Sequence, residues 1–445
     1  MAHAVIVRRT ARFFDDRFGT NAAVRFVLAK IYPDHWSFYL GEFALYAFIL
    51  LVATGIWLTF VYQDAPDRAF DSVAALTRAT PVGYLIRQVH HWSADVFVAA
   101  IVVHMGRIFF TAAYRAPREV NWVIGLTMLV LASLTGFTGY SLPNDALSGT
   151  GLRIADSVTE SVPFVGGWVA EVFNGGAYPG PLLFPHLYTI HVYFLPVTIA
   201  ALLSLHLGLL VYQKHTQFVR DPAHVVGRRF WPDYALRTLA AFAATVAVIV
   251  LLATLVEINP IAQYGPYHDW TVPNPATPDW YAAFLDGGLR LGPSTELRIF
   301  GHPIPPVFWP GVLLPTLAFA FLYTWPWIDR RWTHDEATQH DVLVPPSLAP
   351  RRVGVGVTLL AAAVVLTLAA SDDQFAQALH MPVVAVVWFY RILFPFGSLL
   401  AGVAAATFAR ELAARRARYG RERERVVALV RNAQGGFDER EPETT

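Results

Sequence analysis

Four histidines in two apolar stretches are the residues of this sequence best placed to do chemistry. His90 and His104 are fourteen residues apart in the first stretch. His191 and His206 are fifteen residues apart in the second. Fourteen residues of an α-helix make nearly four turns, about 21 Å along the axis and about 40° short of the same face. Because ionisable groups inside apolar segments are costly and usually functional, we expect imidazoles that point into one bundle interior at two depths.

If the two helices run in the same direction, the four histidines form two facing pairs. The pairs are His90 with His191 and His104 with His206. Helix bundles hold cofactors between facing side chains, so each pair is suited to hold the iron of one haem. The alternative is that each histidine only forms a hydrogen bond to a neighbouring helix. Two similar spacings on two helices favour the haem interpretation.

Two other apolar stretches carry glycine pairs at the spacing of the first histidine pair. Gly41 and Gly55 are fourteen residues apart, and so are Gly125 and Gly139. Glycine lacks a Cβ and lets another group approach the backbone closely, and in a membrane helix that group is most often a neighbouring helix. Matching spacings on three helices instead predict two flat macrocycles at two depths, each edged by glycines.

Membrane-spanning helices must position these residues. Of 445 residues, 55% are hydrophobic and 15% are charged, and several apolar runs are long enough to cross a hydrocarbon core of about 30 Å. We therefore expect an all-α polytopic membrane protein with eight transmembrane helices. The predicted spans are residues 38–62, 84–106, 121–142, 187–212, 236–257, 306–328, 353–370 and 392–409.

Lysine and arginine are concentrated before the first span, in the even-numbered connections and after the eighth span. By the positive-inside rule, both termini are predicted to be cytoplasmic. The chain contains no cysteine, so a covalent c-type haem or a cysteine-ligated iron–sulfur cluster cannot be bound to it. If the chain carries electrons, partner subunits must provide such centres.

The sequence divides into four segments. Residues 1–37 are basic and aromatic and suit an amphipathic helix on the cytoplasmic interface, or a solvated helical extension. Residues 38–218 form a four-helix domain with the paired histidines, and residues 219–410 form a C-terminal four-helix half without them. Residues 411–445 are expected to be a cytoplasmic polar tail, a solvated helix followed by a disordered acidic end. Short helices are expected outside the membrane from residue 151 and within 278–291.

These features together resemble the cytochrome b subunit of the quinol:cytochrome c oxidoreductase, the cytochrome bc complex, over nearly the whole chain. Besides the histidine and glycine pairs, the motifs are GYSLP after the third span and Pro278-Asp279-Trp280-Tyr281, where the family has Pro-Glu-Trp-Tyr. The segments IRQVHHW, LSGTGLRI and QKHTQF are similar to actinobacterial members. This similarity implies a multi-pass protein of a bacterial plasma membrane.

The resemblance implies two non-covalent b-type haems. Their iron ligands would be His90 with His191 near the outer face, and His104 with His206 near the cytoplasm. Arg87 and Arg107 match arginines that pair with haem propionates, and fixed cations suit buried carboxylates. His91 is a rival ligand, but only His90 has the fourteen-residue spacing to His104.

The resemblance also implies an outer site that oxidises quinol, at Asp279 with Pro278, Trp280 and Tyr281. Asp279 would accept a proton from quinol, although it is one methylene shorter than the family glutamate. The alternative is that Asp279 only caps the helix that follows it.

A second site, at the cytoplasmic face, would reduce quinone. Mitochondrial members place an aspartate early in the fifth span, where this sequence has Thr238. Three nearby residues are candidates for this site: Lys214, His215 and Asp233.

The implied function is that of a membrane cytochrome b in a respiratory bc complex. It would oxidise quinol at the outer face and pass electrons through both haems to quinone at the cytoplasmic face, contributing to the proton gradient. The implied partners are a Rieske iron–sulfur protein, a c-type cytochrome subunit and a second copy of the complex, with no nucleic acid. Two alternative functions remain. One is a quinone-reducing membrane anchor that binds two haems and has four or five spans, and the C-terminal four-helix half with the PDWY motif argues against it. The other is a transporter in which the histidines form a proton relay.

Overall fold

The computed structural model describes residues 12–13, 15–17, 19, 28–79, 81–218, 227–270, 277–299, 301–419, 428–432 and 434–440. Within these residues, eight helical segments are long and apolar enough to cross a membrane. They are Trp36–Leu58, Pro81–Phe110, Glu119–Ser141, Leu183–Gln213, Phe230–Leu255, Trp309–Thr333, Pro350–Ala369 and Val383–Ala417. Each segment overlaps one predicted span, so the predicted polytopic helical fold is confirmed.

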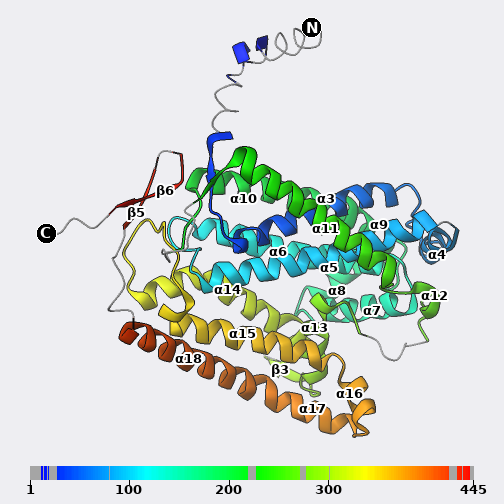
Figure 1. Cartoon of the computed structure of the whole chain (residues 1–445). Helices are drawn as coiled ribbons and strands as arrows, with labels where there is room; N and C mark the ends of the chain where they lie inside the picture. The colour runs from blue at the N-terminus through cyan, green and yellow to red at the C-terminus, as the bar shows by residue number, and fades with distance from the viewer. Residues whose placement is uncertain are drawn as a thin grey trace.

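The first four spans carry the paired histidines. Their elements are η1 (Trp36–Phe38), α3 (Leu40–Leu58), α5 (Pro81–Phe110), α6 (Glu119–Ser141), α9 (Leu183–Thr189), η2 (Ile190–Phe194) and α10 (Leu195–Gln213). Helix α5 packs against α3 and α6, and α10 packs against α6. The second and fourth spans run in the same direction, as the pairing of the histidines requires (Figure 1).

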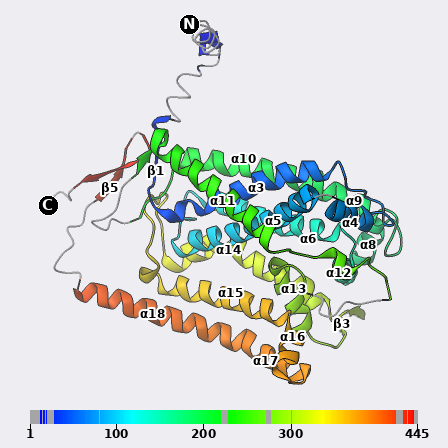
Figure 2. The same cartoon turned by 45° about the vertical axis from the view of Figure 1, so that its right-hand side comes forward.

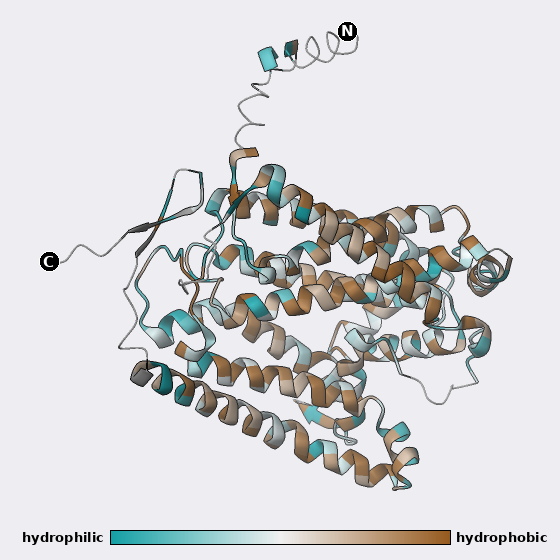
Figure 3. Cartoon of the chain, in the orientation of Figure 1, coloured by the Kyte–Doolittle hydropathy of each residue, from teal (hydrophilic) through white to brown (hydrophobic). Residues whose placement is uncertain are grey.

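The later spans divide between two places. The fifth, η3 (Phe230–Tyr234) with α11 (Ala235–Leu255), packs against α3 and α5. The others lie along one side of the molecule in both views (Figures 1 and 2). They consist of η4 (Trp309–Leu313), α14 (Leu314–Thr333), α15 (Pro350–Ala369), α17 (Val383–Ile392), η6 (Leu393–Gly397) and α18 (Ser398–Tyr419). Figure 3 shows apolar residues along the spans and polar residues gathered towards their ends and connections.

A π-helical turn, η2, interrupts the fourth span at His191. Pro196 follows it and has no N–H to donate to the carbonyl of Val192, so a regular α-helical bond is lost there. The N–H of Leu195 instead bonds to the carbonyl of Ile190, five residues back. Because a π-turn takes up one extra residue, fifteen residues here cover about the rotation that fourteen cover in α5.

Short elements cover the two ends of the bundle (Figures 1 and 2). The terminal face is the end that carries β1 (Ile31–Tyr32) paired with β2 (Arg228–Arg229), η5 (Pro346–Leu348), and β5 (Ala428–Arg431) paired with β6 (Phe437–Arg440). The opposite face carries α4 (Ala69–Ala79), α7 (Ala146–Glu160), α8 (Gly166–Asn174), α12 (Ile261–Tyr264), α13 (Trp280–Leu291), α16 (Asp372–Leu379), and β3 (Leu297–Ile299) paired with β4 (His302–Ile304). The predicted helix near residue 151 begins earlier, because Asp145 caps α7 by accepting bonds from the N–H groups of Leu147 and Ser148.

The structure describes part of the segment at each chain end. In the N-terminal segment, residues 12–13, 15–17 and 28–29 are helical, whereas β1 and η1 follow from residue 31, since Pro33 disfavours a helical Tyr32. Most of the rest of that segment lies outside the described residues, so the amphipathic helix stays a prediction. The predicted disordered end contains β6, which pairs with β5. Arg431 anchors this hairpin by donating to the carbonyl of His215 and to Asp341, both at 2.7 Å.

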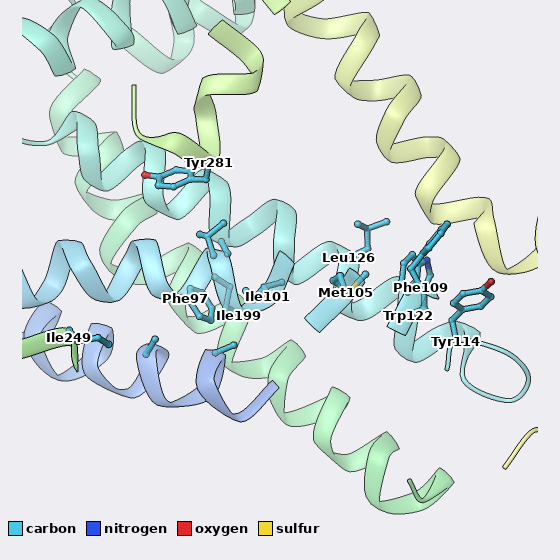
Figure 4. Packing of buried hydrophobic residues seen from close by; sticks show 14 of the residues in the cluster. Phe97, Ile101, Met105, Phe109, Tyr114, Trp122, Leu126, Ile199, Ile249 and Tyr281 are labelled. Atoms are coloured by element: carbon cyan, nitrogen blue, oxygen red, sulfur yellow. The ribbon is translucent and has the colours of Figure 1, made fainter. Parts of the chain in front are cut away.

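The main core is built around α5, with side chains of α3, α6, α10, α11, α13 and α14 packed against it. Figure 4 shows part of this core, with labels on Phe97, Ile101, Met105, Phe109, Tyr114, Trp122, Leu126, Ile199, Ile249 and Tyr281. A buried polar cluster joins the two halves at the terminal end of α5: Asp329 accepts from the Tyr114 hydroxyl at 2.7 Å and pairs with Arg352 at 3.0 Å.

Candidate haem and quinone sites

His90 on α5 and His191 on η2 face each other. Their ring centroids are 6.3 Å apart, and the rings are inclined by 70°. A metal–imidazole bond is about 2 Å long, so one iron fits between facing rings at this separation. In the second predicted pair, the His104 ring of α5 lies against Gly41 of α3, and the His206 ring of α10 lies near Gly125 of α6. The structure therefore brings His90 and His191 together, and the pairing of His104 with His206 stays a prediction.

The hydrogen bonds of the first pair leave the metal-binding nitrogens available. Nδ1 of His90 lies 2.8 Å from the Thr54 hydroxyl. Nδ1 of His191 lies 2.9 Å from the Thr135 carbonyl and 3.2 Å from the Thr138 hydroxyl. A histidine that ligates a metal through Nε2 almost always uses its other nitrogen in this way. These contacts fit the donor set of a haem iron.

All four predicted glycines lie against the paired histidines. A Cβ at Gly55 would be 3.2 Å from Cε1 of His90, and a Cβ at Gly139 would be 3.0 Å from Nε2 of His191. A Cβ at Gly41 would lie against His104, and a Cβ at Gly125 would lie against Met105 and near His206. The glycines thus make room for the imidazoles themselves, and contact with a macrocycle edge remains a prediction.

The Gly139→Val variant should bind less haem than the unaltered protein, because a branched side chain would collide with the His191 ring. Overpacking of this kind costs roughly 1–3 kcal/mol. The haem content per protein, measured by absorbance, checks this expectation. The matched control is Gly106→Val on α5, where a Cβ would meet nothing within 4 Å. Equal haem loss in both variants would show that Gly139 has no special relation to the haem site.

A cavity of about 380 Å³ extends from His90 and His191 to the PDWY motif, residues 278–281. Its lining includes His90, His191, Gly139, Asp279 and Tyr281. Most of the wall is apolar, with a few convergent polar groups, as is typical of cofactor and small-molecule sites. The cavity therefore reaches both the facing imidazoles and the Asp279 carboxylate.

Arg87 and Arg107 both have guanidinium nitrogens without a partner among the residues that the structure describes. Nη2 of Arg87 donates to the carbonyl of Asn259 at 2.5 Å, whereas its Nη1 is buried and unbonded. Arg107 lies 4.2 Å above the Phe38 ring, and its Nε and Nη2 are buried and unbonded. Because buried unsatisfied cations are costly, these donors fit the propionate carboxylates of bound haems.

Asp279 directly precedes α13, but its side chain makes no capping hydrogen bond. Its Oδ2 instead lies 3.0 Å from Nε2 of His91 and accepts from the Tyr281 hydroxyl at 3.0 Å. The capping alternative for Asp279 is therefore not supported by the geometry. Sequence reasoning missed this partnership, since it treated His91 only as a rival ligand. The signal was the adjacent pair His90-His91, whose side chains leave α5 about 100° apart and so face different neighbours.

The rest of the PDWY motif packs at the same place. Pro278 precedes Asp279, and the Trp280 ring packs edge-on against Tyr281 at 6.0 Å. Tyr281 itself is buried against Gly136 of α6, where a Cβ would lie 2.6 Å from its hydroxyl. Gly136 is a second residue that the sequence analysis missed, three residues before Gly139 in GFTGY. A glycine here lets the hydroxyl bonded to Asp279 reach into the bundle.

The three candidates at the terminal face have different surroundings. Lys214 ends α10 with a positive φ of 63°, and Asp233 is exposed on η3. The His215 ring lies 5.1 Å from Tyr32, and burial lowers the pKa of His215 to about 3, with Lys30 and Arg107 adding to the effect. His215 is therefore neutral at neutral pH and, of the three, is the one placed in an aromatic environment.

Comparisons with known proteins agree with this geometry. A family model described as Cytochrome b(N-terminal)/b6/petB matches residues 95–266. The cytochrome bc1 complex cytochrome b subunit of Mycobacterium leprae (strain TN) is 41% identical over 408 residues, which cover 87% of this chain and 74% of that protein. The subunit of the same name from Streptomyces coelicolor is 38% identical over 417 residues, 89% of this chain and 76% of that one.

A solved structure named hyperthermophilic respiratory Complex III has the same fold. It superimposes with a TM-score of 0.67, at 20% identity, over 90% of this chain and 99% of that chain. At this identity the likeness shows the fold alone. The sequence relatives share much higher identity over most of both chains, and on that basis the chain belongs to the family of cytochrome b subunits of cytochrome bc1 complexes.

Proposed function

We propose that the chain binds two b-type haems and carries electrons across the membrane, from a quinol on one side to a quinone on the other. In this proposal it acts within a quinol:cytochrome c oxidoreductase and contributes to a proton gradient. The observation that carries the proposal is the facing pair of His90 and His191, 6.3 Å apart, beside a cavity that also contains Asp279.

When bound, the haems supply one-electron redox centres within the bundle. The residues of the chain hold them in place. Thr54 and Thr135 fix the orientation of the outer imidazoles through their Nδ1 atoms. Arg87 and Arg107 have buried N–H groups that would donate to the propionate carboxylates of the two haems.

Quinol oxidation releases protons as well as electrons, so the site needs a proton acceptor within hydrogen-bond reach. The Asp279 carboxylate lies in the cavity wall and is held by His91 and Tyr281. We infer that a quinol hydroxyl bonds to the free oxygen of this carboxylate and transfers its proton there. His91 and Tyr281 are positioning residues for Asp279 in this step.

The orientation and the partners follow from the same proposal. The terminal face would be cytoplasmic, because the basic connections meet there, and the PDWY face would be the outer one. Since the chain has no cysteine, a Rieske iron–sulfur protein and a c-type cytochrome would be separate subunits beside the outer face. Dimerisation of the complex is part of the proposal.

The absorption spectrum of the purified protein tests the proposed function most directly. The expected result is a set of b-type haem bands that dithionite intensifies, with two transitions in a redox titration and reduction by added quinol. A protein without these bands would contradict the proposal and favour the transporter with a histidine proton relay.

A further inference from the structure

Lys30 is a buried cation at the terminal face, where it directly precedes β1. It is 8% exposed, and its Nζ has no hydrogen-bond or ion-pair partner among the described residues. Burial lowers the pKa of Lys30 to about 8. A buried ammonium group is normally paired with an acid. Lys30 therefore needs an anion that the described part of the chain does not provide.

The backbone holds Lys30 in place without help from its ammonium group. The Lys30 carbonyl accepts a hydrogen bond from the N–H of Phe230 at 2.8 Å, and Ile31 pairs with Arg229 in the β1–β2 sheet. The ammonium nitrogen lies 4.9 Å from the centre of the Tyr32 ring. Because the backbone bonds do not involve the side chain, a substitution of Lys30 tests its charge and leaves the strand intact.

Lys30 and Arg107 contact the same group of rings. This terminal ring cluster consists of Tyr32, His215 and Phe38, with the His215 ring 5.1 Å from Tyr32 and 6.2 Å from Phe38. Lys30 lies against Tyr32, and the Arg107 guanidinium lies 4.2 Å from the centre of the Phe38 ring. Nε and Nη2 of Arg107 are buried and have no partner in the described part of the chain. Two buried cations with unused donors therefore contact one ring cluster.

The ring cluster lies on the terminal side of His104. Arg107 follows His104 by three residues on α5. Phe38 precedes Gly41 by three residues in the first span, and a Cβ at Gly41 would be 3.1 Å from the His104 ring. Residues three apart on a helix are neighbours one turn along the axis. Arg107 and Phe38 are thus each about one turn from the imidazole that is proposed to ligate the inner haem.

The charges around His215 are unbalanced among the described residues. After burial itself, the causes that lower the pKa of His215 are four positive charges: Lys30, Arg107, Arg431 and Arg118. Asp341 pairs with Arg431 at 2.7 Å and with Arg118 at 3.5 Å. No such pair is found for Lys30 or Arg107 where the structure describes the chain. The two propionates of one haem would balance these two cations.

We propose that Lys30 binds one propionate of the inner haem, the haem at His104 and His206, beside the propionate that Arg107 binds, and that its charge raises the reduction potential of this haem. The inference rests on the proposed function, which provides the haem. An ammonium group has three donors and forms strong, charge-assisted hydrogen bonds to a carboxylate. Reduction adds one electron and makes the site more negative by one charge, so a fixed cation nearby favours the reduced form.

The test compares Lys30→Gln with Lys30→Arg in the whole complex, by redox titration of the b-type absorption bands. The transition that is missing in His104→Ala identifies the inner haem. In Lys30→Gln, the equilibrium constant for reduction of this haem should fall about tenfold, which corresponds to about 59 mV for one electron. Lys30→Arg keeps the charge and should keep the potential. The other transition should be unchanged in both variants.

A second readout reports on the carboxylates themselves and does not depend on turnover. If the propionates of the haem carry a carbon-13 label, the infrared redox difference spectrum should contain labelled carboxylate bands that shift in Lys30→Gln. The matched control is Arg229→Gln, which removes one positive charge from the strand paired with β1. Arg229 is exposed, so solvent and salt screen its charge, and both the inner potential and the bands should stay unchanged.

The headgroup of an anionic phospholipid is the other source of an acid group at the terminal face, and the lipid environment separates the two sources. In nanodiscs of phosphatidylcholine alone, the inner potentials of the unaltered protein and Lys30→Gln should differ as they do in native lipid. A difference that appears only with anionic lipid would overturn the proposal in favour of a lipid phosphate.

The remaining outcomes also decide the proposal. Loss of the inner haem alone in Lys30→Gln, with both haems kept in Lys30→Arg, would support it. An unchanged inner transition in Lys30→Gln, or an equal shift of both transitions, would overturn it. Loss of both haems in Lys30→Gln would assign the residue to folding and overturn it as well. An unaltered protein without b-type bands would instead refute the proposed function.

Discussion

The His104→Ala variant is expected to keep one of the two b-type haems and to lose the other. In the proposed function each haem is held by its own pair of imidazoles, and in the first pair the Nδ1 atoms of His90 and His191 are bonded to Thr54 and Thr135. Without His104, only His206 would be left to hold an iron at the second proposed site. A redox titration should therefore show one b-type transition instead of two, and the haem content per protein should fall by about half.

Quinol should still reduce the remaining haem in this variant, because the cavity beside Asp279 adjoins the outer pair. The control is His186→Ala, which removes a histidine of the same span as His191 that belongs to neither proposed ligand pair. Its Nδ1 lies 2.7 Å from the Phe173 carbonyl. That variant should retain both transitions. Two unchanged transitions in His104→Ala would mean that His104 is not an iron ligand.

The Asp279→Asn variant should lose most of its turnover with quinol and still assemble with both haems. Asparagine keeps an oxygen that can accept the Tyr281 hydroxyl, so the local packing is preserved, but it cannot take up a proton. Removal of a general base typically costs 10²–10⁴-fold in rate, so a decrease of about a hundredfold or more is expected. Steady-state reduction of a c-type cytochrome by quinol, with haem content measured on the same sample, gives the result.

Asp279→Glu is the matched variant for this experiment. It restores a carboxylate and the side-chain length that the family motif has, so it should remain active. If Asp279→Asn turns over at nearly the rate of the unaltered protein across pH, the proton leaves by another group. The role of Asp279 would then be limited to its contacts with His91 and Tyr281.

The histidine pairs could be predicted because they depend on local geometry. Helical rotation is a property of a single segment, so the spacing of His90 and His104 already fixes their common face. On the fourth span the two histidines are fifteen residues apart. Only the π-turn at His191, which is caused by Pro196, explains how this pair keeps the same face.

The amino-acid sequence by itself determined the eight spans and the positions of the ligand candidates, because hydrophobic length and helical period are encoded along the chain. Only the tertiary structure decided which groups meet across it. His91 meets Asp279, 188 residues away, and Thr238 meets Glu42, 196 residues away. Such contacts depend on how α13 and α11 pack against α5 and α3, and no local pattern contains that information. The same holds for β5 and β6, whose order depends on Arg431 reaching His215 and Asp341.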